Sequence, residues 1–234
     1  AETLSGHERA SLAAARRAAL AAGATVHRIM EIVSLGVPDA VRVPAEIAEQ
    51  MEALAVAAAE DLVAEGVQAR AWVERLVGMA QGCWLSAPVR HAAASPRMFR
   101  EVPLCARIDD GPASEPLVLQ GFCDLLYEAP DGWVVVDYKT DSVPDEARVR
   151  RRYELQAGGY ALAVWQATGR PVLRAAFVMA AAGSSTRPAP YVEFAVTQEL
   201  LRRARERAAQ RANDLPQRLE MEGKYGGSLA LGEA

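Results

Sequence analysis

The chain has 234 residues, which is enough for one large domain or two small ones with a sizeable buried core. Its content of 51% hydrophobic and 24% charged residues excludes an intrinsically disordered chain. Charged residues interrupt every apolar run before it reaches the length of a membrane span, so we expect no membrane contact, and the net charge of −4 leaves nucleic-acid binding to local basic patches.

The first half of the chain has helical periodicity. Apolar residues recur at helical spacing over about 8–33, 44–65 and 67–85, which predicts three helices. From residue 99 the period becomes that of strands, at 100–108, 117–128 and 133–140. A helix over 145–167, strands near 173–180 and 191–196, and a closing helix over about 197–219, with Thr197 as its N-cap, complete the pattern.

This order of elements predicts one α/β domain over residues 1–221, with a mixed central sheet flanked by helices and a helical N-terminal part. Residues 1–98 form the mainly helical part, and residues 99–221 form the sheet core with its flanking helices. The glycine- and serine-rich segment 222–234 is expected to be a flexible tail.

Two aspartates are predicted to face each other across a hairpin. If the turn centres on Pro130-Asp131, residues whose numbers add up to 261 face each other, so Asp124 lies opposite Asp137; a bulge at Gly132 would shift this pairing by one residue. Two like charges at that spacing need a neutralising partner, and Mg²⁺ with oxygen ligands is the simplest one. Lys139 follows on the same face of the strand as Asp137, and the backbone carbonyl of Tyr138 lies between them.

The alternative interpretation is an ordinary hairpin with a charged solvent face. The run Val134-Val135-Val136 favours the metal site, because it indicates a buried central strand in which idle charges would be costly. Lys139 also favours the metal site, because only Lys139 and Lys224 of the chain's 26 basic residues are lysines.

The segments Gly121-Phe122-Cys123-Asp124, Val136-Asp137-Tyr138-Lys139-Thr140 and Gln156-Ala157-Gly158-Gly159-Tyr160 resemble the PD-(D/E)XK nuclease superfamily. The similarity is to the RecB-like branch, which contains the nuclease domains of RecB and AddA/AddB helicase–nucleases. The resemblance implies a restriction-endonuclease-like core, with metal ligation by Asp124 and Asp137 and catalysis by Lys139. It also implies active-site roles for Gln156 and Tyr160, which share a helix face, and identifies His27 as a third metal ligand.

Glu101 and the arginines are open to two interpretations each. Glu101 resembles a glutamate near the first core strand, which contacts metal-bound water or simply stands at the strand entrance, and we favour the second. Six arginines stand against three acids between residues 145 and 174. They suit DNA backbone phosphates or form a solvated helix face, and the DNA-binding candidates are Arg148, Arg150, Arg151 and Arg152.

The resemblance implies a Mg²⁺- or Mn²⁺-dependent deoxyribonuclease, and we expect an exonuclease rather than an endonuclease. Its expected partners are DNA, as single strands or unwound ends, and a helicase. The chain has no GxxxxGK[ST] loop, so it either stands alone or is the C-terminal nuclease part of a helicase–nuclease for DNA repair and recombination. Because it begins with Ala1, we favour the second. The alternatives are an inactive nuclease fold that binds DNA or a helicase partner, and a nuclease acting on RNA.

Cysteine usage bears on the cofactor and the compartment. Cys83, Cys105 and Cys123 are odd in number and form no CxxC pair. They argue against a zinc site and against the four-cysteine iron–sulfur cluster that some members of the resembled family carry. They also favour a reducing compartment, and we expect a cytoplasmic location with activity at the nucleoid.

Overall fold

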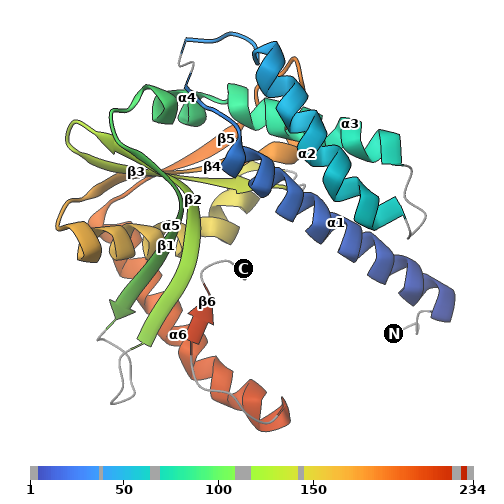
Figure 1. The fold of residues 1–234 in the computed structure, drawn as a ribbon. Coiled ribbons are helices and arrows are strands. Elements are labelled where there is room, and N and C mark those ends of the chain that lie inside the picture. Colours follow the sequence, from blue (N-terminus) through green and yellow to red (C-terminus); the bar gives the residue numbers. More distant parts are fainter. Residues whose placement is uncertain are drawn as a thin grey trace. The chain divides into compact units, whose positions relative to one another are not determined.

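The computed structural model describes residues 5–36, 39–63, 69–108, 117–141, 145–222 and 228–230 (Figure 1). The chain divides into two compact units, each assembled from separate stretches of sequence. The first unit contains Ala1–Ala94, Tyr138–Ser142 and Val178–Tyr191, and the second contains Ser95–Asp137, Val143–Phe177 and Val192–Ala234.

The first unit is helical. Its helices are α1 (Gly6–Ile32), α2 (Ala45–Val63), α3 (Ala69–Leu85), α4 (Ala87–Ala94) and the short 3-10 helix η1 (Ala180–Ala182). Helix α1 begins with a capping box, in which the Ser5 side chain accepts from the backbone N–H of Glu8 and the Glu8 side chain accepts from that of Ser5.

Trp84 anchors the core of the first unit. The side chain is fully buried, and its indole N–H donates to the Ser34 carbonyl at 2.8 Å. The Arg90 guanidinium lies 3.4 Å from the centre of the Trp84 ring and donates to the Trp84 carbonyl. Burial lowers the pKa of Arg90 to about 10, which still leaves it charged at neutral pH.

The second unit holds most of a mixed sheet. The strands are β1 (Met98–Ile108), β2 (Leu117–Ala129), β3 (Gly132–Lys139), β4 (Val172–Met179), β5 (Tyr191–Ala195) and β6 (Ser228–Ala230), and the helices are α5 (Glu146–Thr168) and α6 (Gln198–Glu222). The strand order is β1-β2-β3-β4-β5, and β6 pairs with β2. The N–H of Trp133 bonds to the Pro171 carbonyl at 2.8 Å, so β3 and β4 start side by side and run parallel, joined by α5.

The β2–β3 hairpin has the predicted register. Its pairs include Leu125 with Val136 and Ala129 with Gly132, so the two-residue turn adds no bulge. Strand β2 also pairs with β6, over Val118–Gln120. On this edge of β2, therefore, residues 121–124 lie between the stretches paired with β6 and with β3.

Helices α5 and α6 pack against each other in the second unit (Figure 1). Gly158 of α5 lies at a point of close approach between them. A Cβ atom built on Gly158 would lie 2.3 Å from the Cβ of Ala204 and 3.3 Å from the Leu200 carbonyl oxygen. The pair Gly158-Gly159 weakens a helix by about 1 kcal/mol per glycine, so the sequence predicts close packing or close substrate approach there, and the structure shows close packing.

The predicted helices and strands are confirmed, with ends that differ by up to three residues. The Thr197 hydroxyl accepts from the N–H of Leu200, as expected of an N-cap. Helix α4 was not predicted, and the expected tail lies mostly outside the described residues, with 228–230 forming β6. None of the described helices is long and apolar enough to cross a membrane.

Replacing Gly158 by alanine is expected to destabilise the protein by about 1–3 kcal/mol, because the new methyl group overlaps that of Ala204. The melting temperature should fall by about 2–10 °C. The double variant Gly158→Ala/Ala204→Gly removes the opposing methyl and should recover most of the loss in a thermal melt. An additive double variant would contradict the assigned contact.

Candidate active site

Asp124 and Asp137 occupy facing positions on β2 and β3. The last pair of the ladder is Leu125 with Val136, and the next residue on each strand is an aspartate. Only 5% of Asp124 and 4% of Asp137 is exposed. The predicted juxtaposition of two buried carboxylates follows from this register.

Glu101 joins them from β1. The pairs Arg100 with Leu125 and Val102 with Cys123 place Glu101 opposite Asp124, and a carboxylate oxygen of Glu101 lies within 4.8 Å of one of Asp124. Glu101 has φ 48°, a left-handed conformation that costs a residue with a side chain about 1–2 kcal/mol. The strand-entrance interpretation that the sequence favoured does not describe this position of Glu101 next to Asp124. We call the three residues Glu101, Asp124 and Asp137 the carboxylate cluster.

Tyr160 and Gln156 of α5 hold one side of this cluster. The Tyr160 hydroxyl lies 2.8 Å from Oδ1 of Asp137 and 2.5 Å from the Phe122 carbonyl oxygen, so its single proton faces two acceptors. The Gln156 amide donates to the same hydroxyl at 2.6 Å. Both α5 residues are buried, and they position Asp137 through a hydrogen-bonded chain.

The cluster creates a strongly negative environment. The pKa of Tyr160 is raised far above its ordinary value by burial, and then by Asp137 and Asp124. The pKa of the buried Cys123 thiol is also raised well above its usual value, by burial and by Asp137, Asp124 and Glu101. Cys123 therefore stays protonated and is no thiolate nucleophile.

The residues that follow Asp137 belong to the first unit. Lys139 ends β3, is half-buried, and lies two positions beyond Asp137 in the same strand. The His27 ring of α1 packs edge-on against the Tyr138 ring, with centroids 5.9 Å apart. One helical turn earlier, a Cβ on Gly23 would lie 3.1 Å from the Thr140 hydroxyl oxygen, so α1 passes close to the end of β3.

The four candidate DNA-binding arginines lie in the first turns of α5 and differ in their surroundings. Arg150 binds Glu146 at 2.7 Å and the Glu193 carbonyl at 3.0 Å, so its exposed side chain is fixed by partners within the protein. Arg151 and Arg152 instead line a hollow between α5 and α6. Arg148 is exposed, and its backbone N–H is capped by Asp145.

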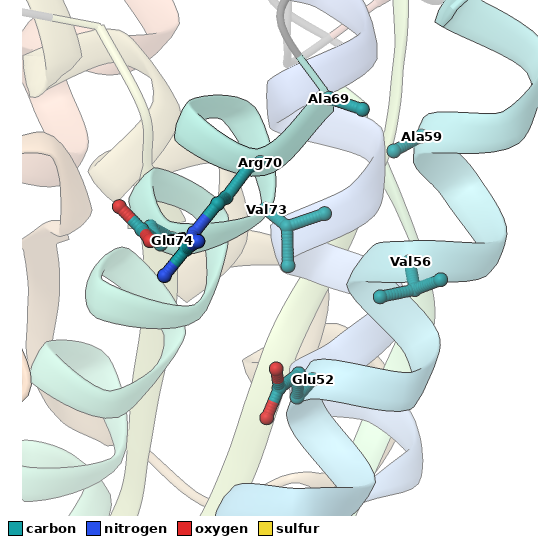
Figure 2. Close-up of a pocket in the computed structure, with 7 residues that line it drawn as sticks. All are labelled: Glu52, Val56, Ala59, Ala69, Arg70, Val73 and Glu74. Atoms are coloured by element: carbon teal, nitrogen blue, oxygen red, sulfur yellow. Dashed lines mark hydrogen bonds and ion pairs between the residues drawn. The ribbon is translucent and has the colours of Figure 1, made fainter.

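Another hollow, of about 470 Å³, lies between α2 and α3 in the first unit. In Figure 2, Val56 and Val73 point into it from the two helices, and Arg70 and Glu74, which form an ion pair at 3.0 Å, lie at one side. Its lining contains none of the candidate site residues, so it carries no part of the predicted chemistry.

The donor set of the carboxylate cluster fits a hard divalent cation. Three carboxylates gathered on adjacent strands supply the oxygen ligands that Mg²⁺ and Mn²⁺ prefer. A cation at the cluster would also offset the repulsion that raises the pKa of its neighbours Tyr160 and Cys123.

Comparison with known proteins gives a consistent result. The family model of the PD-(D/E)XK nuclease superfamily matches residues 4–226 of the chain. The chain is also similar to ATP-dependent helicase/nuclease subunits from several bacteria. Identity is 37% over 102 residues for Acetivibrio thermocellus, 38% over 88 for Bacillus velezensis and 42% over 59 for Clostridium botulinum strain Okra. These matches cover 38%, 31% and 25% of this chain, but only 8%, 7% and 5% of the relatives.

Replacing Tyr160 by phenylalanine is expected to lower the free energy of unfolding by about 1–3 kcal/mol, because a buried carboxylate, carbonyl and amide lose a shared partner. Urea denaturation in EDTA measures the change. The control Tyr191→Phe removes a hydroxyl from a side chain that is 43% exposed and should change stability by less than about 0.5 kcal/mol. Equal stability of the two variants would refute the buried network.

Proposed function

Because the chain belongs to the PD-(D/E)XK nuclease superfamily, we propose that it hydrolyses DNA phosphodiester bonds at the carboxylate cluster with Mg²⁺ or Mn²⁺. The observation that carries this proposal is the arrangement of β1, β2 and β3, which brings carboxylate oxygens of Glu101 and Asp124 within 4.8 Å of each other and places Asp137 opposite Asp124 on the next strand. The lysine of the family motif follows at the end of β3.

Asp124 and Asp137 are the proposed principal metal ligands, with Glu101 as a further carboxylate and the Tyr138 carbonyl as a backbone ligand. His27 is proposed as a ligand because of the family resemblance and because its ring packs on Tyr138, the residue after Asp137. When bound, the cation supplies an acidified water and positive charge next to the phosphate.

The remaining site residues act on protons and orientation. Lys139 points to the same face of β3 as Asp137, and its ammonium orients the attacking water and offsets charge that builds on the phosphate. Tyr160 and Gln156 fix the carboxylate of Asp137 through the hydrogen bonds described above. The exposed arginines of α5, Arg148, Arg151 and Arg152, with Arg150 beside them, are proposed to contact the DNA backbone.

The proposed setting is the C-terminal nuclease part of a helicase–nuclease. The relatives are described as helicase/nuclease subunits, and this chain corresponds to a small share of their length. A helicase partner would deliver single-stranded or unwound DNA ends in the cytoplasm, which favours exonuclease over endonuclease action. The rival proposal is an inactive module that binds DNA or a helicase, against which the intact Asp124, Asp137 and Lys139 argue.

We expect the wild-type protein to degrade end-labelled linear single-stranded DNA with Mg²⁺ or Mn²⁺, and EDTA to abolish the reaction. Asp137→Ala and Lys139→Ala should each lower the rate about a hundredfold or more, because each removes charge stabilisation or water activation. Lys139→Arg should not restore it, since a forked guanidinium differs in shape and hydration from an ammonium.

The matched control for this assay is Asp131→Asn, which removes a carboxylate from the exposed turn of the same hairpin and should keep full activity. Parallel reactions with circular DNA and with RNA distinguish exonuclease, endonuclease and ribonuclease activity. Metal-dependent cleavage that survives both Asp137→Ala and Lys139→Ala would refute the assignment.

Binding of Mn²⁺ is expected to stabilise the wild-type protein, by about 2.7 kcal/mol at a hundred times the dissociation constant. For a protein of this size, that is a rise in melting temperature of about 5–10 °C. Glu101→Gln should weaken Mn²⁺ binding in calorimetry, while Asp131→Asn should not. DNA binding without any specific Mn²⁺ binding would favour the inactive module.

A further inference from the structure

A hollow lined by arginines lies between α5 and α6 in the second unit. Its volume is about 240 Å³. The lining residues, which we call the arginine pocket, are Arg151, Arg152, Leu155, Arg207, Gln210 and Arg211. The part of this lining that the structure describes contains four guanidinium groups, one amide and no carboxylate.

The pocket is a consequence of how the two helices pack. Gly158 and Ala204 touch where α5 and α6 are closest, and the Arg207 guanidinium reaches the Arg151 carbonyl at 3.4 Å. The helices therefore run antiparallel, and the arginines that precede Gly158 meet those that follow Ala204. Leu155 is buried and is the apolar residue of the lining.

The carboxylates near the pocket lie outside its lining. On the outer face of α6, Arg202 binds both Glu199 and Glu206. Beside the pocket, the single carboxylate of Glu154 is shared between Arg203 at 3.2 Å and Arg207 at 2.9 Å. Arg203 also binds Glu199 at 2.9 Å, so Glu154 and Glu199 meet the arginines from outside, while the lining itself brings together four guanidinium groups.

The pocket is connected to the active site through α5. Arg152, Gln156 and Tyr160 are spaced four residues apart, and Tyr160 bonds to Asp137. At 1.5 Å per residue, Arg152 lies about 6 Å along the helix from Gln156 and about 12 Å from Tyr160. At the rise of about 3.4 Å per nucleotide of a stacked, duplex-like strand, this corresponds to about two to four nucleotides.

We propose that the arginine pocket binds a backbone phosphate of the DNA strand, about two to four nucleotides from the phosphate that is cleaved. The guanidinium forks of two helices match phosphate oxygens, and the Gln210 amide adds a neutral donor. This inference rests on the proposed function, because it takes the strand to run from the carboxylate cluster along α5. The pocket would hold the strand without reading its sequence.

The test measures binding without cleavage. A fluorescein-labelled 12-nucleotide single strand is titrated in EDTA, and anisotropy is followed at several salt concentrations. We expect Arg151→Gln/Arg211→Gln, with one change on each helix, to weaken binding about tenfold. It should also lower the slope of log affinity against log salt by about 0.7, the value for one lost phosphate contact on a single strand.

The control is Arg174→Gln/Arg202→Gln, which removes the same charge from exposed positions of the second unit outside the pocket. It should change affinity less than twofold. Equal losses in the two double variants would overturn the pocket and indicate a general charge effect. If inorganic phosphate displaces the 12-mer when both are present at the same concentration, the assignment of the pocket to a DNA strand would also be overturned.

A second readout separates this inference from the proposed function. If the protein cleaves DNA, the pocket variant should raise KM for the 12-mer and leave kcat nearly unchanged, because its residues lie away from the reacting phosphate. If the protein does not cleave DNA but only the pocket variant loses binding, the nuclease proposal fails and the pocket stands. Cleavage with unchanged 12-mer binding and KM in the pocket variant overturns the pocket alone.

Discussion

Two aspartate carboxylates that face each other inside a sheet set the main physical constraint on this protein. Asp124 and Asp137 are almost completely buried, and Glu101 adds a third carboxylate from the neighbouring strand. Buried like charges are costly unless hydrogen bonds and a counter-charge compensate them. The strained backbone of Glu101 adds to this cost, and such strain is retained where a function requires the geometry.

Helix α5 provides the hydrogen bonds that compensate part of this cost. Tyr160 and Gln156 supply the hydrogen bonds, and Tyr160 reaches the Phe122 carbonyl in the stretch of β2 that lies between its pairings with β3 and β6. The same helix must remain fixed against α6, which the close contact at Gly158 provides. Because α5 carries both the site's hydrogen bonds and two of the pocket's four arginines, its packing matters to both.

The sequence predicts those parts of the site that depend on local rules. A two-residue turn fixes the β2–β3 register, so the facing of Asp124 and Asp137 follows from the chain alone. Ile108 at the end of β1 and Leu117 at the start of β2 are nine positions apart in the sequence, so no two-residue turn predicts their register, and the position of Glu101 opposite Asp124 could not be derived. The helix α4 was missed because it is short and follows α3 after a break at Ser86, although Pro88 suits a first turn.

The arginine pocket depends on tertiary packing and therefore lay beyond sequence analysis. Arg151 and Arg211 are 60 positions apart, and only the contact of Gly158 with Ala204 brings their helices together. Charge counting along the chain grouped Arg150 with its neighbours, whereas its side chain is held by Glu146 and the Glu193 carbonyl. A pattern along one helix indicates where arginines lie, but their partners decide which of them can bind a ligand.

The two kinds of basic residue also have different physical uses here. Arginine holds a proton under all ordinary conditions and presents a planar fork, which suits a phosphate that must be held in place. Lys139 has a compact ammonium with three donors on a flexible stem, which suits a charge placed beside carboxylates and moving protons. In a chain whose other described basic residues are arginines, the proposed function would therefore assign the chemical step to the lysine at the end of β3 and the holding of the strand to arginines.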